Sequence, residues 1–418
     1  MGLLVHGKWE DRWYDTAGHE GHFKRSAAQF RNWVTADGSP GPGARGGFKA
    51  EAGRYHLYVS LACPWANRTL IFRHLKGLEE MIGLSVVHWR MKEHWWTFEE
   101  GDGVIPDPIN GAGYMHQVYT AALPDYSGRV TVPVLWDKQE GTIVSNESSE
   151  IIRMFNSAFD EVGARPGDYY PEDLRHQIDE INTRIYNCVN NGVYKAGFAT
   201  SQEPYEEAVE PLFETLDWLE HRLANRRYLF GDRLTEADWR LFPTLVRFDP
   251  VYFGHFKCNR RRLVDYPNLW AYARDLYQQE GFGDTVHFDH IKRHYYMTHE
   301  RLNPQRIVPL GPVVDWDAPH GREGIDDRHA EQVEQQVGER GGHFQRAAVS
   351  GVYRGQGSQE HAEEQDRHPG QGAALQEQPG SEQEQRKELC SQSAQPGLAM
   401  GRGKEQPAAG DHHQSPFA

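Results

Sequence analysis

The chain has 418 residues, enough for two or three domains, and its formal net charge of −15 argues against nucleic acid as its main partner. Only 38% of the residues are hydrophobic, and no stretch approaches the ~20 apolar residues of a membrane span. The 22 histidines show no zinc-type spacing, and the four cysteines are too far apart for the disulfide framework of a small secreted domain. No metal site is expected, and a reducing cytosol fits this composition.

The first 160 residues predict an N-terminal extension followed by a small α/β domain. Residues 1–50 form the extension, which is rich in Gly, Trp and charge and has no basic region before a long apolar run, so no signal peptide is expected. Strands are predicted over 55–59, 84–88, 130–136 and 142–145, the third interrupted by Pro133. Helical patterns cover 65–75 and 146–156, and 93–117 is predicted to be a loop. These elements place the α/β domain at 51–160.

The most informative motif of the α/β domain lies where its first strand meets its first helix. Cys63 follows the apolar strand, and Pro64 takes the first helical position, where its missing N–H costs nothing. Helix N-termini favour anions, so a thiolate is predicted here with a lowered pKa. A lone cysteine is more often a small buried hydrophobe, but strand, turn, Cys-Pro and helix together favour a nucleophile. No second cysteine stands two residues away, so an external thiol must complete any redox cycle.

The second half of the chain predicts long helices and then a polar tail. Apolar residues recur at helical spacing around 178–189, 205–223 and 270–277, which indicates an all-α domain at 161–300 with a short segment at 301–323. Thr235 and Asp238 have the spacing of a helix capping box. From 324 to 418 Gln, Glu, Gly, Arg and His dominate, and such a composition buries too little apolar surface to offset the ordering entropy. Residues 324–418 are therefore predicted to be disordered.

These motifs together resemble a known family. A cysteine at a helix start, a Val132-Pro133 strand, a Ser-Asn-Glu-Ser turn and a helical second half are similar to a glutathione transferase. The forms at 63–66 (Cys-Pro-Trp-Ala), 143–148 (Ile-Val-Ser-Asn-Glu-Ser) and 291–296 (Ile-Lys-Arg-His-Tyr-Tyr) resemble its Xi class, the glutathionyl-hydroquinone reductases. The resemblance runs to about residue 323. It implies a thioredoxin-like domain plus an all-α domain.

The resemblance also implies roles for individual residues. Cys63 stands at the family's nucleophile, Tyr194 at a proton donor, and Tyr252 and Tyr295 where hydroxyls help to lower the cysteine pKa. The glutathione-binding positions correspond to Trp96, Arg129, Val130, Thr131, Val132, Glu147 and Ser148. The family fold would make the Val132–Pro133 peptide bond cis.

Several of these roles have an independent physical rationale, and some have ordinary alternatives. The backbone of Val132 can pair with the cysteinyl unit of glutathione like an added strand. The Glu147 carboxylate can take an ammonium, the helix start at Ser148 a carboxylate, and Arg129 the other carboxylate. Simple N-capping is the alternative for Glu147 and Ser148, and aromatic packing is the alternative for each tyrosine.

The implied activity is the reduction of glutathionyl-hydroquinones through a mixed disulfide between Cys63 and glutathione. Glutathione is then a co-substrate, and no cofactor or metal is expected. The family suggests a homodimer, and no nucleic-acid or membrane partner is expected. Two alternatives stay open at this point: an omega-like thiol transferase or dehydroascorbate reductase, and a binding module of the same fold without turnover.

Overall fold

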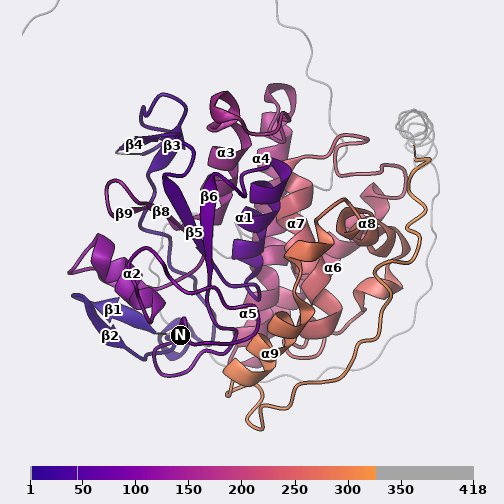
Figure 1. Ribbon diagram of the computed structural model, residues 1–418. Helices are drawn as coiled ribbons and strands as arrows, with labels where there is room; N and C mark the ends of the chain where they lie inside the picture. Colours follow the sequence, from indigo (N-terminus) through magenta and orange to yellow (C-terminus); the bar gives the residue numbers. More distant parts are fainter. Residues whose placement is uncertain (1, 45, 326–418) are drawn as a thin grey trace, which may run out of the picture.

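The structure, a computed structural model, describes residues 2–44 and 46–325 of the chain. Figure 1 shows a sheet with its helices, built from the first part of the chain, beside a group of helices built from the second part. The predicted combination of an α/β thioredoxin-like domain and an all-α domain is thereby confirmed. The tail predicted to be disordered, 324–418, lies outside the described residues except for 324 and 325.

The central sheet has four strands in the order β6, β5, β8, β9. Their bounds are β5 Tyr55–Val59, β6 Ile82–Val86, β8 Val134–Asp137 and β9 Thr142–Ser145. β6 runs parallel to β5, whereas β8 is antiparallel to both β5 and β9. All five residues of β5 are buried, as expected of a strand that is covered on both faces. The strands predicted at 55–59 and 142–145 are confirmed residue for residue.

The strand predicted over 130–136 is only partly correct. The ladder starts at Val134, and residues 130–133 lie outside it. Pro133 has no N–H to donate, so this stretch cannot continue a central strand in the N-terminal direction. The backbone at Val132 is thereby left unpaired with the sheet, next to the start of the first helix.

Three helices accompany the sheet: α1 Pro64–Leu75, α2 Met115–Ala122 and α3 Ser148–Ser157. α1 and α3 pack against each other. α2 was not predicted, because the loop expected over 93–117 overlaps its first turn. Its apolar positions span only two turns, which is too short for a periodic signal.

The N-terminal extension is more ordered than its composition indicates. β1 Leu3–Val5, β2 Lys8–Glu10 and β7 Gly128–Arg129 form a small antiparallel sheet in the order β2, β1, β7. β3 Trp33–Thr35 pairs in parallel with β4 Gly47–Lys49. Strands of two or three residues leave no periodic pattern, so the sequence could not reveal them. The β1–β7 pairing ties the extension to the segment that precedes Val130.

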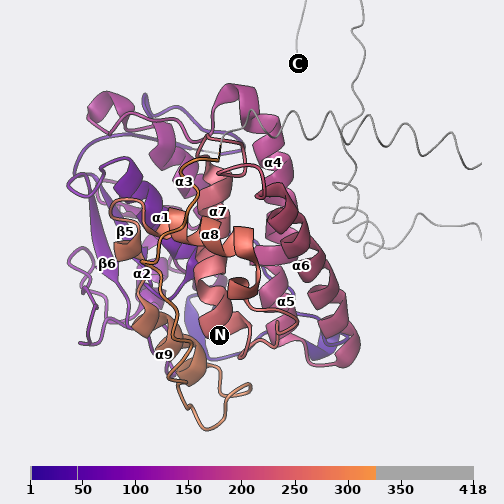
Figure 2. The same ribbon diagram turned by 90° about the vertical axis from the view of Figure 1, so that its right-hand side faces the viewer.

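The second half consists of helices (Figure 2). Their bounds are α4 Arg175–Arg184, α5 Gly192–Phe198, α6 Gln202–Arg222, α7 Glu236–Arg247, α8 Pro267–Tyr277 and α9 Phe288–Thr298. π-helical segments follow α4 at Ile185–Asn190 and α7 at Phe248–Tyr252. α7 packs against α1 and so joins the two halves. The predicted capping box is confirmed, since Asp238 Oδ2 accepts the Thr235 backbone N–H at 2.9 Å.

The segment after α9 runs back along the helices toward α8 (Figure 2). Trp316 is buried there, and its ring lies 4.8 Å from that of Trp270 and 5.2 Å from that of Tyr277. None of the described helices is long and apolar enough to cross a bilayer. Within the described residues, no three His, Cys, Asp or Glu side chains gather in a way that could hold a metal ion.

Candidate active site

Cys63 occupies the N-cap of α1, directly after β5 and a short turn, and Pro64 is the first helical residue. The turn is closed by a hydrogen bond from the Cys63 N–H to the carbonyl of Ser60 at 3.1 Å. The thiol donates to the carbonyl of Val132, with 3.6 Å between sulfur and oxygen. The predicted local geometry is correct, and it places the sulfur beside Val132, in a stretch that does not pair with the central sheet.

The pKa of the Cys63 thiol departs from the predicted direction. Burial raises it, and this effect outweighs the backbone N–H groups of Ala66 and Trp65 and the charges of Arg247 and Arg25, all of which lower it. The expected lowering at the helix N-terminus is therefore wrong in net direction for the protein without a bound ligand. The sequence showed the helix end but could not show that the fold leaves Cys63 only partly exposed to water.

A small cavity of about 90 Å³ opens beside this helix start. Five of the predicted glutathione-binding residues line it, namely Arg129, Thr131, Val132, Glu147 and Ser148. The Val132–Pro133 peptide bond is cis, as predicted. Val130, by contrast, is buried in the core and does not line the cavity. The predicted residues that line the cavity therefore come from two separate stretches of the chain, 129–132 and 147–148.

Glu147 is the N-cap of α3. Its Oε1 accepts from the backbone N–H of Ser149 at 3.0 Å and from the Ser149 hydroxyl at 2.8 Å. The capping alternative is thus realised in the protein without a ligand. Oε2 makes no hydrogen bond to any described residue. One carboxylate oxygen holds the helix start, and the other can serve an ammonium in the cavity.

Arg129 is engaged with the N-terminal extension. Its guanidinium donates to the carbonyls of Arg12 at 2.6 Å and Trp13 at 3.2 Å, and it lies 4.2 Å above the ring of Tyr14. If Arg129 binds a carboxylate as predicted, its guanidinium must do so while it also makes these contacts. Thr131 is fixed from the other side, because Tyr119 donates its hydroxyl to the Thr131 carbonyl at 2.9 Å.

The three predicted tyrosines form one hydrogen-bonded group. The Tyr295 hydroxyl lies 2.5 Å from the hydroxyl of Tyr194 and 3.2 Å from that of Tyr252. Burial raises the pKa of each hydroxyl, and a charge on Cys63 would raise the pKa of Tyr194 and Tyr252 further. All three tyrosines are therefore protonated at neutral pH, and Tyr194 and Tyr252 lie within electrostatic reach of the sulfur. Their hydrogen bonds run to one another, and none among the described residues reaches the sulfur.

Trp96 lies away from the cavity. It is buried, and its ring stacks on that of His294 at 5.0 Å. Burial lowers the pKa of His294 to about 4, so this imidazole is neutral. Trp96 therefore packs beside the neighbour of Tyr295 instead of joining the residues around Glu147.

Arg247 of α7 is a residue that sequence reasoning missed. Its fully buried guanidinium donates to the carbonyls of Ala62 at 2.9 Å and Leu61 at 3.3 Å, and to the amide oxygen of Asn67 at 3.0 Å. Arg247 thus binds residues both before and after Cys63 and holds the turn in place. An arginine inside the mostly apolar stretch 241–248 was the available signal, because a buried charge needs partners.

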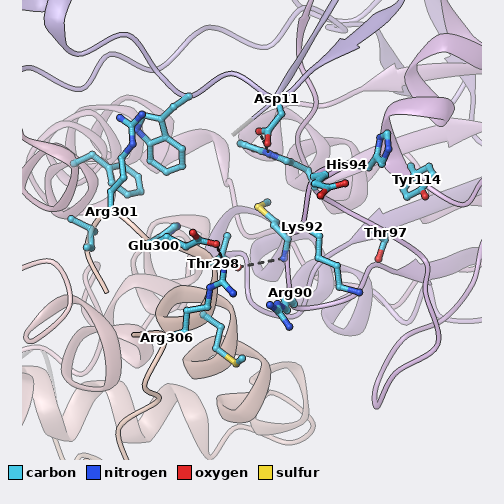
Figure 3. A pocket seen from close by; sticks show the side chains of 18 of the residues that line it. Asp11, Arg90, Lys92, His94, Thr97, Tyr114, Thr298, Glu300, Arg301 and Arg306 are labelled. Carbon is cyan, nitrogen blue, oxygen red and sulfur yellow. Dashed lines mark hydrogen bonds and ion pairs between the residues drawn. The ribbon is translucent and has the colours of Figure 1, made fainter. Parts of the chain in front are cut away.

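A second and larger cavity, of about 950 Å³, lies between the segment 90–99 and the segment 297–306 at the end of α9 (Figure 3). The backbone N–H of Met91 donates to the Thr298 hydroxyl across it at 3.4 Å. Charged side chains of both signs surround it, and Lys92 pairs with Glu99 at 2.6 Å. None of the predicted site residues lines this cavity, so it stands apart from the cysteine site.

A thioredoxin-like sheet, a cysteine at its first helix and a helical second half define the class of glutathione transferases. Comparison with protein families agrees: the glutathione S-transferase N-terminal domain matches residues 62–158, and the C-terminal domain matches residues 202–275.

Two individual proteins are similar to the chain over nearly their whole length. Glutathionyl-hydroquinone reductase YqjG of Escherichia coli K12 is 59% identical over 324 residues, which are 77% of this chain and 99% of the relative. Glutathionyl-hydroquinone reductase PcpF of Sphingobium chlorophenolicum is 59% identical over 313 residues, or 75% of this chain and 97% of the relative.

Solved structures give the same result. The glutathione-bound structure of YqjG from E. coli K-12 has a TM-score of 0.72 at 56% identity and covers 77% of this chain and 99% of that one. A Xi-class glutathione transferase from Natrialba magadii also has a TM-score of 0.72, at 50% identity, and covers 78% and 98%. The chain therefore belongs to the glutathione transferases, in the Xi class that includes the glutathionyl-hydroquinone reductases.

Proposed function

We propose that this protein reduces glutathionyl-hydroquinones to hydroquinones at the expense of glutathione. The observation that carries the proposal is 59% identity to a glutathionyl-hydroquinone reductase across 99% of that relative's length. The arrangement of Cys63, Val132 and the tyrosine group supports it, because it offers a nucleophile, an edge for a peptide-like ligand and a protonated acid side by side.

The proposed first step breaks the carbon–sulfur bond of the substrate. The Cys63 thiolate attacks the glutathione sulfur, a sulfur–sulfur bond forms, and the electron pair of the old bond goes to the aromatic ring. Tyr194, which burial keeps protonated, supplies the proton that the ring takes up. A phenol ring that tautomerises to a ketone weakens the carbon–sulfur bond and so favours this step.

The proposed second step regenerates the enzyme. The thiol of a second glutathione gives its proton to Tyr194 and attacks the mixed disulfide on Cys63, releasing glutathione disulfide and the Cys63 thiolate. The ring has then gained two electrons, and two glutathionyl sulfurs have been oxidised to one disulfide. Val132 would pair with the cysteinyl unit of glutathione, and Glu147, Ser148 and Arg129 with its charged ends. Trp96 and Val130 remain proposed glutathione contacts on the resemblance alone, whereas Thr131 also lines the cavity.

Replacement of the nucleophile tests the proposal. Cys63→Ser should leave no more than a few percent of hydroquinone release, because a serine hydroxyl stays protonated at neutral pH and is a poor nucleophile toward sulfur. Glutathione binding, measured by calorimetry, should survive. Cys258→Ala is the matched control, since Cys258 is buried far from water and is not a candidate nucleophile.

Mass spectrometry should find one glutathionyl group on the wild-type enzyme and on Cys258→Ala, and none on Cys63→Ser. Substantial turnover by Cys63→Ser would overturn the mechanism. Assays with a small disulfide and with dehydroascorbate, run beside the hydroquinone assay, separate the omega-like alternative. A homodimer and a cytosolic location are part of the proposal, and light scattering on the purified protein tests the first.

A further inference from the structure

Arg25 comes from the N-terminal extension, yet it lies among the proposed catalytic residues. Its guanidinium carbon is 4.9 Å from the ring centre of Tyr194 and 5.1 Å from that of Trp65. Trp65 follows the nucleophile by two residues, and Tyr194 is the proposed proton donor. Arg25 also lines the small cavity together with Val132 and Glu147. A cation is therefore held between the nucleophile's helix and the acid.

The hydrogen bonds of Arg25 are incomplete. Nε donates to the Asn191 amide oxygen at 3.1 Å, which anchors the side chain to the helical half. Nη2 is buried and has no acceptor in the described part of the chain. Buried donors are almost always paired, and an unpaired one attached to a charged group is costly. No described carboxylate pairs with Arg25 to meet this need.

The position of Arg25 also matches where negative charge arises. Its charge acts on both Cys63 and Tyr194, lowering the pKa of each against the effect of burial. Guanidinium groups bind oxyanions in a planar, two-pronged geometry, and the unpaired Nη2 leaves one prong open. Stacking on two aromatic faces holds the group in place without using its donors.

We propose that Arg25 is a substrate-binding residue that takes an oxyanion of the bound substrate on its open Nη2. This inference rests on the proposed function. Two oxyanions of that substrate share the required chemistry: a carboxylate of the glutathionyl moiety, and the ring oxygen that gains charge while the carbon–sulfur bond breaks. In either case the guanidinium forms no covalent bond, and the proton still comes from Tyr194.

The test compares Arg25→Met with Lys24→Met, which removes one positive charge from the neighbouring exposed position. Arg25→Met should lower kcat/KM for a glutathionyl-hydroquinone by about tenfold or more, and Lys24→Met should change it less than about twofold. Arg25→Lys keeps the positive charge but loses the planar, two-pronged guanidinium. Its kcat/KM should therefore lie between those of Arg25→Met and Lys24→Met. Thermal melts confirm that each variant is folded.

The two sources of the oxyanion give different results. If it is a glutathione carboxylate, calorimetry shows weaker glutathione binding by Arg25→Met. If it is the ring oxygen, glutathione binding is unchanged and the loss appears in kcat. Equal kcat/KM for Arg25→Met and Lys24→Met would overturn the proposal.

A merely structural Arg25 is excluded by removing its anchor. Asn191→Ala deletes the partner of Nε and leaves the guanidinium in the chain. A loss as large as that of Arg25→Met would show that the contact between segments is what matters, and would overturn the proposal. If the wild-type protein releases no hydroquinone, the proposed function fails by itself. Glutathione affinity of Arg25→Met then decides the Arg25 proposal separately, with unchanged affinity counting against it.

Discussion

At the scale of single residues, Tyr295 is the link in the tyrosine group. Its hydroxyl lies within hydrogen-bond distance of those of Tyr194 and Tyr252, while the Cys63 thiol donates to the Val132 carbonyl. A hydroxyl that donates to another tyrosine can turn toward a thiolate once one forms, since O–H groups rotate freely. The tyrosines can therefore act on the charged sulfur even though the neutral thiol does not use them.

Changing both Tyr252 and Tyr295 to Phe should raise the pKa of Cys63. Loss of donors disfavours the thiolate, so the alkaline limb of reactivity moves to higher pH and less thiolate remains at neutral pH. The rate of alkylation by iodoacetamide, measured against pH, reports the midpoint. Tyr296→Phe is the control, because its hydroxyl donates to the Pro250 carbonyl and not to this group. A midpoint equal to wild type in the double variant would show that the hydroxyls serve only one another.

Residue-level prediction succeeded where the signal was local. Cys63, Pro64 and Glu147 stand at helix starts that a few neighbouring residues define. Arg25 lines the cavity and Arg247 binds the turn before Cys63. Both come from segments distant from Cys63 in the sequence, so no local pattern could assign them. The direction of the Cys63 pKa failed for a similar reason, because burial is set by the whole fold.

At the scale of elements, α3 begins at a residue with two tasks. The Glu147 carboxylate caps the helix through Ser149 and also faces the cavity. Glu147→Ala should cost about 1 kcal/mol of stability for the lost cap and also weaken glutathione binding. Glu147→Gln keeps an acceptor for the cap but loses the charge. It should melt close to wild type yet bind glutathione more weakly by about 2 kcal/mol, or roughly 30-fold.

Calorimetric titration with glutathione and a thermal melt on each variant separate the two tasks. Wild-type affinity in Glu147→Gln would leave capping as the only role of this side chain.

The long elements were predictable because burial repeats along them, as in β5, α6 and α8. The short strands of the extension and the two-turn α2 were not, because pairing with distant partners, not a repeated pattern, determines them.

At the scale of the whole molecule, the last described residues pack against the helical half of the protein. Arg322 is 2% exposed and donates to the carbonyls of Leu223 at 2.9 Å and Arg227 at 3.0 Å, and also to the Arg226 carbonyl. Trp316 fills the space against α8. These contacts attach the chain up to about residue 323 to the helical half. About three quarters of the chain covers nearly the full length of both reductase relatives.

A chain that ends after Glu323 should therefore fold and turn over like the full-length protein. A chain that ends after Asp315 is the matched comparison, because it also removes Trp316 and Arg322. Losing a buried tryptophan and leaving several buried carbonyls unpaired should lower its stability by on the order of 3 kcal/mol or more. Thermal melts and hydroquinone release, measured on both truncations, test this. Activity lost on cutting after Glu323 would show that residues 324–418 contribute to the site or to the fold. Equal stability of the two truncations would show that the Trp316 and Arg322 contacts do not hold the helical half together.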